Sequence, residues 1–184
     1  MARTPSNSVP LGSDMPAATL PDVTRGELLE LRSLLGRPSV VMFICNHCPF
    51  VKHLKSALSA FGRECQAQGV GVVAISSNDV TSHPSDGPEL MQQDARANAY
   101  TFPYLYDESQ AVARAFDAAC TPEFYVFDAA GKLAYHGQFD DSRPGNDVPV
   151  TGQDLRAAVD ALLAGQRPSA IQKASIGCNI KWRP

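Results

Sequence analysis

The stretch that decides the fold is residues 39–49, SVVMFICNHCP. Its first six residues form a continuous apolar run, rich in β-branched and large side chains and too short for an ordinary helix. Such a run predicts a strand that is buried on both faces. After the motif CNHCP, apolar residues recur at steps of three and four, which predicts an amphipathic helix of about four turns. These residues are Val51, Leu54, Leu58, Phe61 and Cys65.

The rest of the chain extends this unit. A second buried strand is predicted over residues 70–76, and strand, helix and strand in this order form a parallel, right-handed unit. Residues 28–35 predict a short helical turn upstream. Downstream patterns predict helices over 89–98 and 109–119, a strand over 101–105, a hairpin over 123–136 and a last helix after the N-cap Thr151. The predicted class is α/β, with a central mixed sheet flanked by helices on both faces.

The whole chain, residues 1–184, is predicted to form a single domain. Prolines and a glycine interrupt every regular pattern in residues 1–20, which predicts an irregular N-terminal arm. Residues 166–184 show no clear period and are predicted to form a C-terminal tail.

Composition disfavours several classes of protein. The formal net charge is −3, without the basic face that a phosphate backbone requires, so nucleic-acid binding is not expected. No apolar run reaches the roughly 18 residues of a membrane span, and residues 1–20 lack the apolar core of a secretory signal. Five cysteines are too few for a disulfide scaffold, so we expect a cytoplasmic protein whose thiols are catalytic, metal-binding or buried. The oligomeric state stays open.

The pair Cys45 and Cys48 predicts thiol–disulfide exchange. A Cys-x-x-Cys that ends a buried strand and opens a helix places its first sulfur near unpaired N–H groups, where negative charge is favoured. We therefore expect the pKa of Cys45 to lie below the free value of about 8.5. Cys48 is close enough in sequence to close a disulfide and release a captured partner. Pro49 fits the first helical turn, where its missing N–H is not needed.

The residues around the pair leave alternatives open. An imidazolium at His47 would stabilise the Cys45 thiolate further, or His47 is only an exposed polar residue. Asn46 is interpreted as an N-cap. The cysteines are alternatively half of a zinc site, although no second Cys-x-x-Cys supplies the other ligands, or an inert buried pair. No nucleotide, flavin or haem motif is found, so we expect no bound cofactor and assign no metal.

Two segments carry a family resemblance: residues 44–49, ICNHCP, and Cys120-Thr121-Pro122 leading into a strand. They resemble the thioredoxin fold. The chain is more closely similar to the thioredoxin-like proteins of the alkyl hydroperoxide reductase/thiol-specific antioxidant (AhpC/TSA, or redoxin) superfamily. The similarity covers residues 11–182 through the blocks FICNHCPFV, VVAISSND, FPYLYDESQ, ACTPEFYVFD, GQFDDSRP and SIGCNIKW. It implies a thioredoxin-like fold of the peroxiredoxin-like variant.

The resemblance also implies roles for single residues. Cys45 resembles the nucleophilic cysteine and Cys48 the resolving one. Thr121-Pro122 resembles a cis-proline turn that lies against the active-site disulfide, and the cis form of such a bond costs only about 0.5–1 kcal/mol. A trans Pro122 at the start of an edge strand is the alternative. The expected catalytic set is Cys45, Cys48, His47 and Pro122, and the residues expected at the substrate are Asn46, Pro49 and Thr121.

Two departures from the family pattern matter. Ser39 stands where compact thioredoxins carry a buried acid, so Glu123 is a candidate for proton transfer, with a solvated strand residue as its alternative. Peroxiredoxins place Thr or Ser three residues before the peroxidatic cysteine, whereas Met42 and Cys45 stand three residues before Cys45 and Cys48. Direct peroxidase activity is therefore less favoured.

Three further cysteines complete the inventory. Cys120 is a third redox thiol, a metal ligand or an ordinary buried residue. Cys178 is a resolving thiol on the tail or a packing residue, and Cys65 belongs to the core.

The predicted function is that of a thiol–disulfide oxidoreductase. Cys45 attacks a disulfide of a protein or a small molecule, Cys48 resolves the mixed disulfide, and an external thiol reductant resets the pair. One alternative is a thiol peroxidase, an antioxidant in which one cysteine of the pair becomes a sulfenic acid. A second is a metal-binding or metallochaperone module that uses Cys45, Cys48 and Cys120.

Overall fold

The computed structural model describes residues 3–184, which form a seven-stranded sheet, a three-stranded sheet and helices. The large sheet has the order β3-β2-β6-β5-β4-β8-β9 and the small sheet the order β1-β10-β7. The strands are β1 (Thr4–Pro5), β2 (Thr19–Asp22), β3 (Glu27–Glu30), β4 (Ser39–Phe43), β5 (Gly71–Ser76), β6 (Tyr104–Tyr106), β7 (Cys120–Thr121), β8 (Glu123–Phe127), β9 (Leu133–Gly137) and β10 (Ile176–Asn179). The α-helices are α1 (Pro49–Ala67), α2 (Pro88–Ala97), α3 (Ala111–Ala115) and α4 (Gln153–Leu163), and the 3-10 helices are η1 (Leu31–Leu34) and η2 (Pro84–Asp86).

The predicted parallel unit lies at the centre of the large sheet. β4 and β5 pair in parallel, with Ser39 opposite Gly71, and α1 connects them. β6 adds to β5 in parallel, whereas β8 runs antiparallel to β4 and β9 returns antiparallel to β8. The expected α/β class with a mixed sheet is confirmed.

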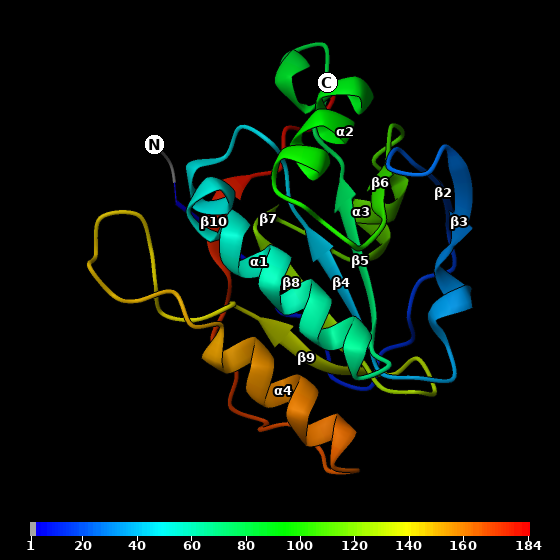
Figure 1. Cartoon of the computed structure of the whole chain (residues 1–184), viewed down its shortest axis with the longest axis vertical. Helices are drawn as coiled ribbons and strands as arrows, with labels where there is room; N and C mark the ends of the chain where they lie inside the picture. Colours follow the sequence, from blue (N-terminus) through cyan, green and yellow to red (C-terminus); the bar gives the residue numbers. More distant parts are fainter. Residues whose placement is uncertain (1–2) are drawn as a thin grey trace.

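Both faces of the large sheet are covered, because alternate residues of a strand point to opposite sides. In β4, Val40 and Met42 belong to one apolar core, and Val41 and Phe43 belong to the other. α1, α2 and α4 contribute to the first core, while α3 and the N-terminal arm contribute to the second. Figure 1 shows α1 and α4 across the front of the sheet. The prediction of helices on both faces is therefore confirmed.

The N-terminal arm and the C-terminal tail are more regular than the sequence predicts. Thr4 on β1 pairs with Gly177, and Cys178 pairs with Thr121 on β7, so the tail forms a strand between two distant segments. Pairing between segments so far apart in sequence leaves no local period. The sequence pattern could not reveal it for that reason.

Two local predictions need correction. The helical turn predicted over residues 28–35 forms only at Leu31–Leu34, as η1, while the residues before it belong to β3 because Leu29 pairs with Leu20 on β2. Gly152, and not Thr151, is the N-cap of α4. Its φ is 70°, and a Cβ there would lie 2.5 Å from the Phe139 ring, so glycine satisfies both the conformation and the space.

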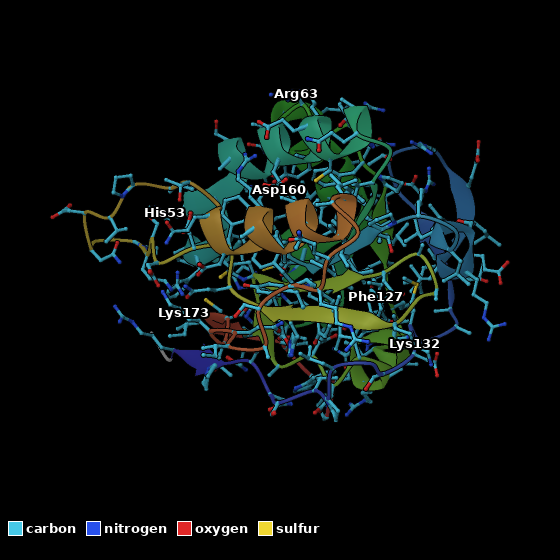
Figure 2. All side chains as sticks on the ribbon, turned by 90° about the horizontal axis from the view of Figure 1, so that it is seen from below. His53, Arg63, Phe127, Lys132, Asp160 and Lys173 are labelled. Carbon is cyan, nitrogen blue, oxygen red and sulfur yellow. The ribbon has the colours of Figure 1, made fainter. Side chains whose placement is uncertain are left out.

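One long loop stands out from the surface of the molecule (Figure 2). The loop of residues 140–150 projects from the body, and His53 on α1 lies at its base, with Nε2 2.7 Å from Ser142 Oγ (Figure 2). Among the described residues, no helix combines the length and the apolar character that crossing a membrane requires.

Candidate active site

The cysteine motif connects the buried end of β4 to α1. Cys45 lies in the connecting segment, Cys48 is the N-cap of α1, and Pro49 is the first helical residue. Both thiols are free, and both residues are buried, with exposures of 1% and 0%. The helix therefore begins at the second cysteine of the motif instead of the first.

Cys48 is surrounded by groups that favour its ionised form. As the N-cap residue it lies at the positive end of α1. The pKa of Cys48 is lowered to about 5, first by the hydrogen bond with the Cys45 thiol, against the opposing effect of burial. The thiol and backbone of Cys178 and the N–H of Val51 lower this pKa further. In its neutral form the Cys48 thiol donates to Thr121 O at 3.2 Å. The thiolate cannot donate there, and it accepts instead from the Cys45 thiol, Cys178 and the Val51 N–H.

Cys45 has the opposite environment. Its pKa is raised by the hydrogen bond with Cys48, by burial and by the carboxylate of Asp86. The Thr121 hydroxyl, 3.4 Å from Cys45 Sγ, opposes this shift in part. The expectation that the pKa of Cys45 is lowered is therefore wrong for the reduced pair. The physical reason is that the open N–H groups belong to a helix that starts after Cys48.

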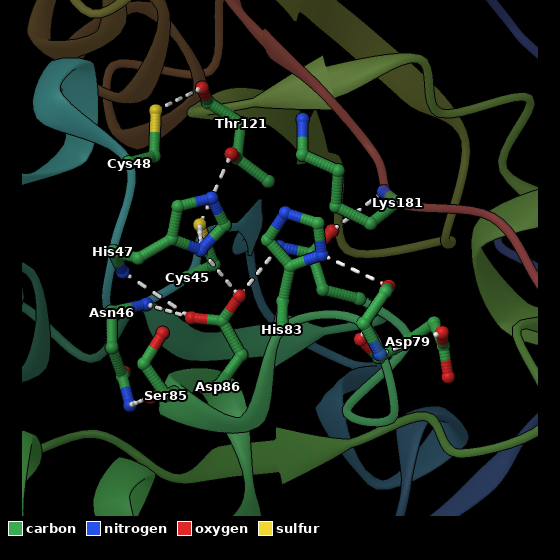
Figure 3. Close-up of polar contacts among 12 residues, drawn as sticks. Cys45, Asn46, His47, Cys48, Asp79, His83, Ser85, Asp86, Thr121 and Lys181 are labelled. Carbon is green, nitrogen blue, oxygen red and sulfur yellow. Dashed lines mark hydrogen bonds and ion pairs between the residues drawn. The ribbon is translucent and has the colours of Figure 1, made fainter.

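Asp86, at the end of η2, holds the motif in place. Its Oδ1 accepts from the backbone N–H of Asn46 at 2.9 Å and of His47 at 3.2 Å, while its Oδ2 accepts from Asn78 Nδ2 at 2.8 Å. His47 Nδ1 lies 2.6 Å from the same Oδ2 (Figure 3). The Asp86 residue is fully buried. Sequence reasoning missed it because the segment from Ser77 to Pro88 has the composition of a loop, and nothing local indicates which of its acids turns inward.

His47 lies beside the first cysteine, as the motif spacing predicts. Its Nδ1 is 3.8 Å from Cys45 Sγ, and a quarter of its side chain is exposed. Because Asp86 is a hydrogen-bond acceptor at 2.6 Å, we assign the proton on Nδ1 to that contact. The His47 ring also lies against the His83 ring, with centroids 4.9 Å apart and planes tilted by 30°, so two imidazoles lie beside the motif (Figure 3).

Asn46 and Pro49 lie on either side of His47 and Cys48 in the motif. Asn46 does not cap a helix, contrary to expectation, because α1 begins three residues later. Its Nδ2 donates to Ser85 O at 2.8 Å, and its Oδ1 accepts from the Tyr104 hydroxyl at 3.2 Å. This buried side chain ties the motif to η2 and β6. Pro49 occupies the first turn of α1, as predicted.

The Thr121-Pro122 peptide bond is cis. Thr121 faces both sulfurs, with its carbonyl oxygen at Cys48 and its hydroxyl at Cys45. Thr121 also pairs with Cys178 across the small sheet. Residues 120–122 and the tail thus meet the cysteine motif, although the three segments are far apart in sequence.

Glu123 is not the solvated strand residue that the sequence allowed. It is fully buried, with Oε1 accepting from the Tyr125 hydroxyl at 2.6 Å and Oε2 from the Cys120 N–H at 3.0 Å. Its Oε1 also lies 2.7 Å from His136 Nε2, and its Oε2 accepts from the Ala119 N–H at 2.9 Å. Burial opposes ionisation, but these hydrogen bonds outweigh it and keep the pKa of Glu123 below its ordinary value.

The other three cysteines are all buried. Cys65 packs in the core with its pKa raised by burial to about 12, as a core residue should. Cys120 is buried beneath the cis bond, with its sulfur 3.9 Å from Pro122 O and its pKa raised by burial. Cys178 is buried and belongs to the same core cluster as Cys45 and Cys48.

One potential metal-ligand group exists among the described residues. A sulfur of Cys45, a ring nitrogen of His47 and a carboxylate oxygen of Asp86 lie within 4.8 Å of one another. This set differs from the expected set of Cys45, Cys48 and Cys120, in which the Cys120 sulfur faces Pro122 O. The oxygens of Asp86 already receive donors from the backbone, Asn78 and His47, so hydrogen bonding accounts for the arrangement.

Comparisons with known proteins identify the family of the chain. The sequence model of the AhpC/TSA family matches residues 11–136. An uncharacterized conserved protein from Geobacillus kaustophilus superposes with a TM-score of 0.98 at 50% identity, over 100% of this chain and 98% of that one. A hypothetical protein from Sinorhizobium meliloti 1021 superposes with a TM-score of 0.95 at 48% identity, over 98% of both chains.

A more distant structure supports the fold alone. The thioredoxin domain of a thiol-disulfide oxidoreductase from Bacteroides vulgatus superposes with a TM-score of 0.60 at 17% identity, over 74% of this chain and 91% of that one. No curated protein sequence matches the chain. The expected thioredoxin-like fold is confirmed by these superpositions.

Proposed function

The chain belongs to the AhpC/TSA family, and from this premise we propose that it is a thiol–disulfide oxidoreductase whose redox pair is Cys45 and Cys48. The observation that carries the proposal is the pair itself. Two free, buried thiols of one Cys-x-x-Cys motif both face Thr121, and one of them lies at the N-cap of α1. A thiolate with a second thiol beside it is what disulfide exchange requires.

We assign the attack to Cys48 and the resolution to Cys45, the reverse of the roles that the family resemblance implies. The attacking sulfur must be ionised, and the electrostatics favour a thiolate at Cys48, whose pKa is lowered to about 5. Cys45 keeps its proton beside the Asp86 carboxylate. A low pKa also makes Cys48 a good leaving group when the mixed disulfide is later reversed.

The reaction proceeds in two exchanges. The Cys48 thiolate attacks one sulfur of a substrate disulfide, forms a mixed disulfide and expels the other sulfur as a thiolate. That thiolate takes up a proton, and Cys45 loses its own proton. The Cys45 sulfur then attacks Cys48, so the pair becomes a disulfide and the second substrate thiol leaves. The substrate gains two electrons, which the pair supplies.

Two neighbours assist these exchanges. The His47 N–H, which Asp86 holds 3.8 Å from Cys45 Sγ, presents its positive end near the sulfur that becomes charged during resolution. Thr121 fixes both sulfurs through its carbonyl and hydroxyl oxygens. For the wider setting we propose a protein or small-molecule disulfide as substrate, an external thiol as reductant and a reducing cytoplasm as the compartment.

A single-turnover experiment with an aromatic disulfide such as Ellman's reagent tests this proposal, because the first exchange releases a coloured thiol. Cys48→Ala should lose the release at neutral pH, whereas Cys45→Ala should keep it. Cys65→Ala, which removes a buried thiol from the same helix, is the matched control and should behave as wild type. Peptide mapping of the oxidised wild type should recover a Cys45–Cys48 disulfide. Release that survives Cys48→Ala but is lost in Cys45→Ala would overturn the assignment of roles.

A thiol peroxidase is the second candidate, favoured by the same ionised sulfur at the N-cap of α1. The Cys48 thiolate would cleave a peroxide to an alcohol and become a sulfenic acid, which Cys45 would condense with to release water. In Cys45→Ala/Cys178→Ala, which removes both thiols that lower the pKa of Cys48, this acid should persist after addition of hydrogen peroxide and react with dimedone. Absence of that adduct, with disulfide exchange intact, would reject the peroxidase.

A further inference from the structure

The C-terminal strand brings a third thiol to the redox pair. β10 pairs antiparallel with β7, and Cys178 stands directly opposite Thr121. The backbones approach closely here, since a Cβ on Gly177 would lie 2.0 Å from Thr121 O. Thr121 O is also the atom that accepts the Cys48 thiol at 3.2 Å. One carbonyl group therefore marks where the tail and the cysteine motif meet.

The Cys178 side chain points to the Cys48 side of the small sheet. Cys178 and Cys48 share one buried apolar cluster, and β10 packs against α1, the helix that Cys48 caps. Both the thiol and the backbone of Cys178 interact with the Cys48 sulfur. Cys48 therefore lies between two thiols, Cys45 from its own motif and Cys178 from the tail.

We propose that Cys178 is a second resolving thiol, which attacks Cys48 and closes an alternative Cys48–Cys178 disulfide. This inference rests on the proposed function, because it needs a Cys48 that forms disulfides. It gives the tail a chemical role in addition to packing.

Cys178 can attack Cys48 in either of two disulfides, and atoms and electrons balance in both. When Cys48 carries a mixed disulfide, the Cys178 sulfur bonds to Cys48, the substrate sulfur leaves, and the proton of Cys178 ends on that leaving thiol. When the Cys45–Cys48 disulfide has formed, the same attack breaks it, and the proton ends on Cys45. One S–S bond breaks and one forms in each case, so no further oxidant is needed.

Cys178 is a slower nucleophile while Cys48 is reduced than after Cys48 is oxidised. Its pKa is raised to about 12, by burial first and then by the hydrogen bond to Cys48 and the charge there. The second and third of these effects end when Cys48 becomes part of a disulfide. The positive charge of Lys181, close in sequence, lowers the pKa of Cys178 and so favours its ionisation. Resolution by Cys178 is thus coupled to the oxidation state of Cys48.

The other cysteines do not offer the same geometry. Cys120 also lies on β7, but its sulfur faces Pro122 O. Cys65 lies on α1 well beyond the first turn that carries Cys48. They provide controls for the removal of a buried thiol.

The test uses the full chain and oxidised glutathione as the probe. In Cys45→Ala the normal resolving thiol is absent, so Cys178 alone can resolve the adduct at Cys48. We expect about two equivalents of glutathione per protein and a Cys48–Cys178 disulfide in the peptide map. Cys45→Ala/Cys178→Ala should release about one equivalent and keep glutathione on Cys48. Cys45→Ala/Cys120→Ala should match Cys45→Ala.

A second variant keeps the thiol but moves the strand. Gly177→Ala adds a Cβ that cannot fit against Thr121 O, so β10 must shift from β7. Combined with Cys45→Ala, it should reduce the second release of glutathione although Cys178 is still present. A stable glutathione adduct in Cys45→Ala, with only one equivalent released, would overturn the role of Cys178. Failure to release even the first equivalent would instead overturn the proposed function.

Discussion

Replacing Asp86 by Asn tests how the site is held together. The carboxylate receives four hydrogen-bond contacts, two at each oxygen. An amide has one oxygen, so the substitution keeps an acceptor for the N–H groups of Asn46 and His47 and places an NH₂ group against Asn78 and the His47 ring. Two contacts to a buried charge are then lost at constant side-chain volume.

The expected loss of stability follows from those two contacts. A hydrogen bond to a charged group contributes about 1.5–3 kcal/mol, so the loss of two should lower the free energy of unfolding of Asp86→Asn by roughly 3–6 kcal/mol. The change also removes a negative charge that raises the pKa of Cys45. The pKa of Cys45 should therefore fall in the variant, while the fold stays the same.

Urea unfolding of the reduced proteins measures the first effect, and the pH dependence of thiolate absorbance measures the second. Asp160→Asn, at an exposed position on α4, is the matched control and should change stability by no more than about 0.5 kcal/mol. If Asp86→Asn were as stable as that control and left the titration of Cys45 unchanged, Asp86 would not be the group that holds the motif.

Three further predictions concern single contacts. Cys178→Ala should raise the pKa of Cys48, because the thiol of Cys178 lowers it; an unchanged titration of Cys48 would contradict that contact. Glu123→Gln should cost about 3–5 kcal/mol in urea unfolding, since buried donors lose a charged acceptor, and a loss under about 1 kcal/mol would refute it. Because the pKa of Glu123 is lowered in the fold, its stabilisation should be complete above the ordinary carboxyl pKa and lost as the pH falls through the lower folded value. His47→Gln should slow the second thiol release in stopped-flow assays but spare the first, and equal slowing of both would contradict a role in resolution.

The strands and helices that show a regular local pattern of apolar residues were predictable from the sequence. The run over residues 39–44 became β4, and the three-and-four spacing after it became α1. The burial of Glu123 was not predictable, because it depends on donors that only the folded turn before β8 and the neighbouring β9 supply. Asp86 and β10 were likewise hidden, since their partners lie in distant segments.

The reversed acidity of the two cysteines had a signal in the sequence. Proline is favoured at the first position of a helix, and Pro49 at that position makes Cys48 the N-cap. The sequence interpretation placed Pro49 in the first turn but let the helix dipole act on Cys45. The second cause, the Asp86 carboxylate beside Cys45, comes from η2 and needed the folded structure.

Titration of the reduced protein by the ultraviolet absorbance of its thiolates tests most directly whether Cys48 is the ionised sulfur. The other cysteines have raised pKa values, so a step at low pH reports Cys48 alone. We expect a step with a midpoint near pH 5, lost in Cys48→Ala and kept in Cys65→Ala. Absorbance that rises only near the free-thiol value of about 8.5, or a low-pH step that survives Cys48→Ala, would contradict a thiolate at Cys48.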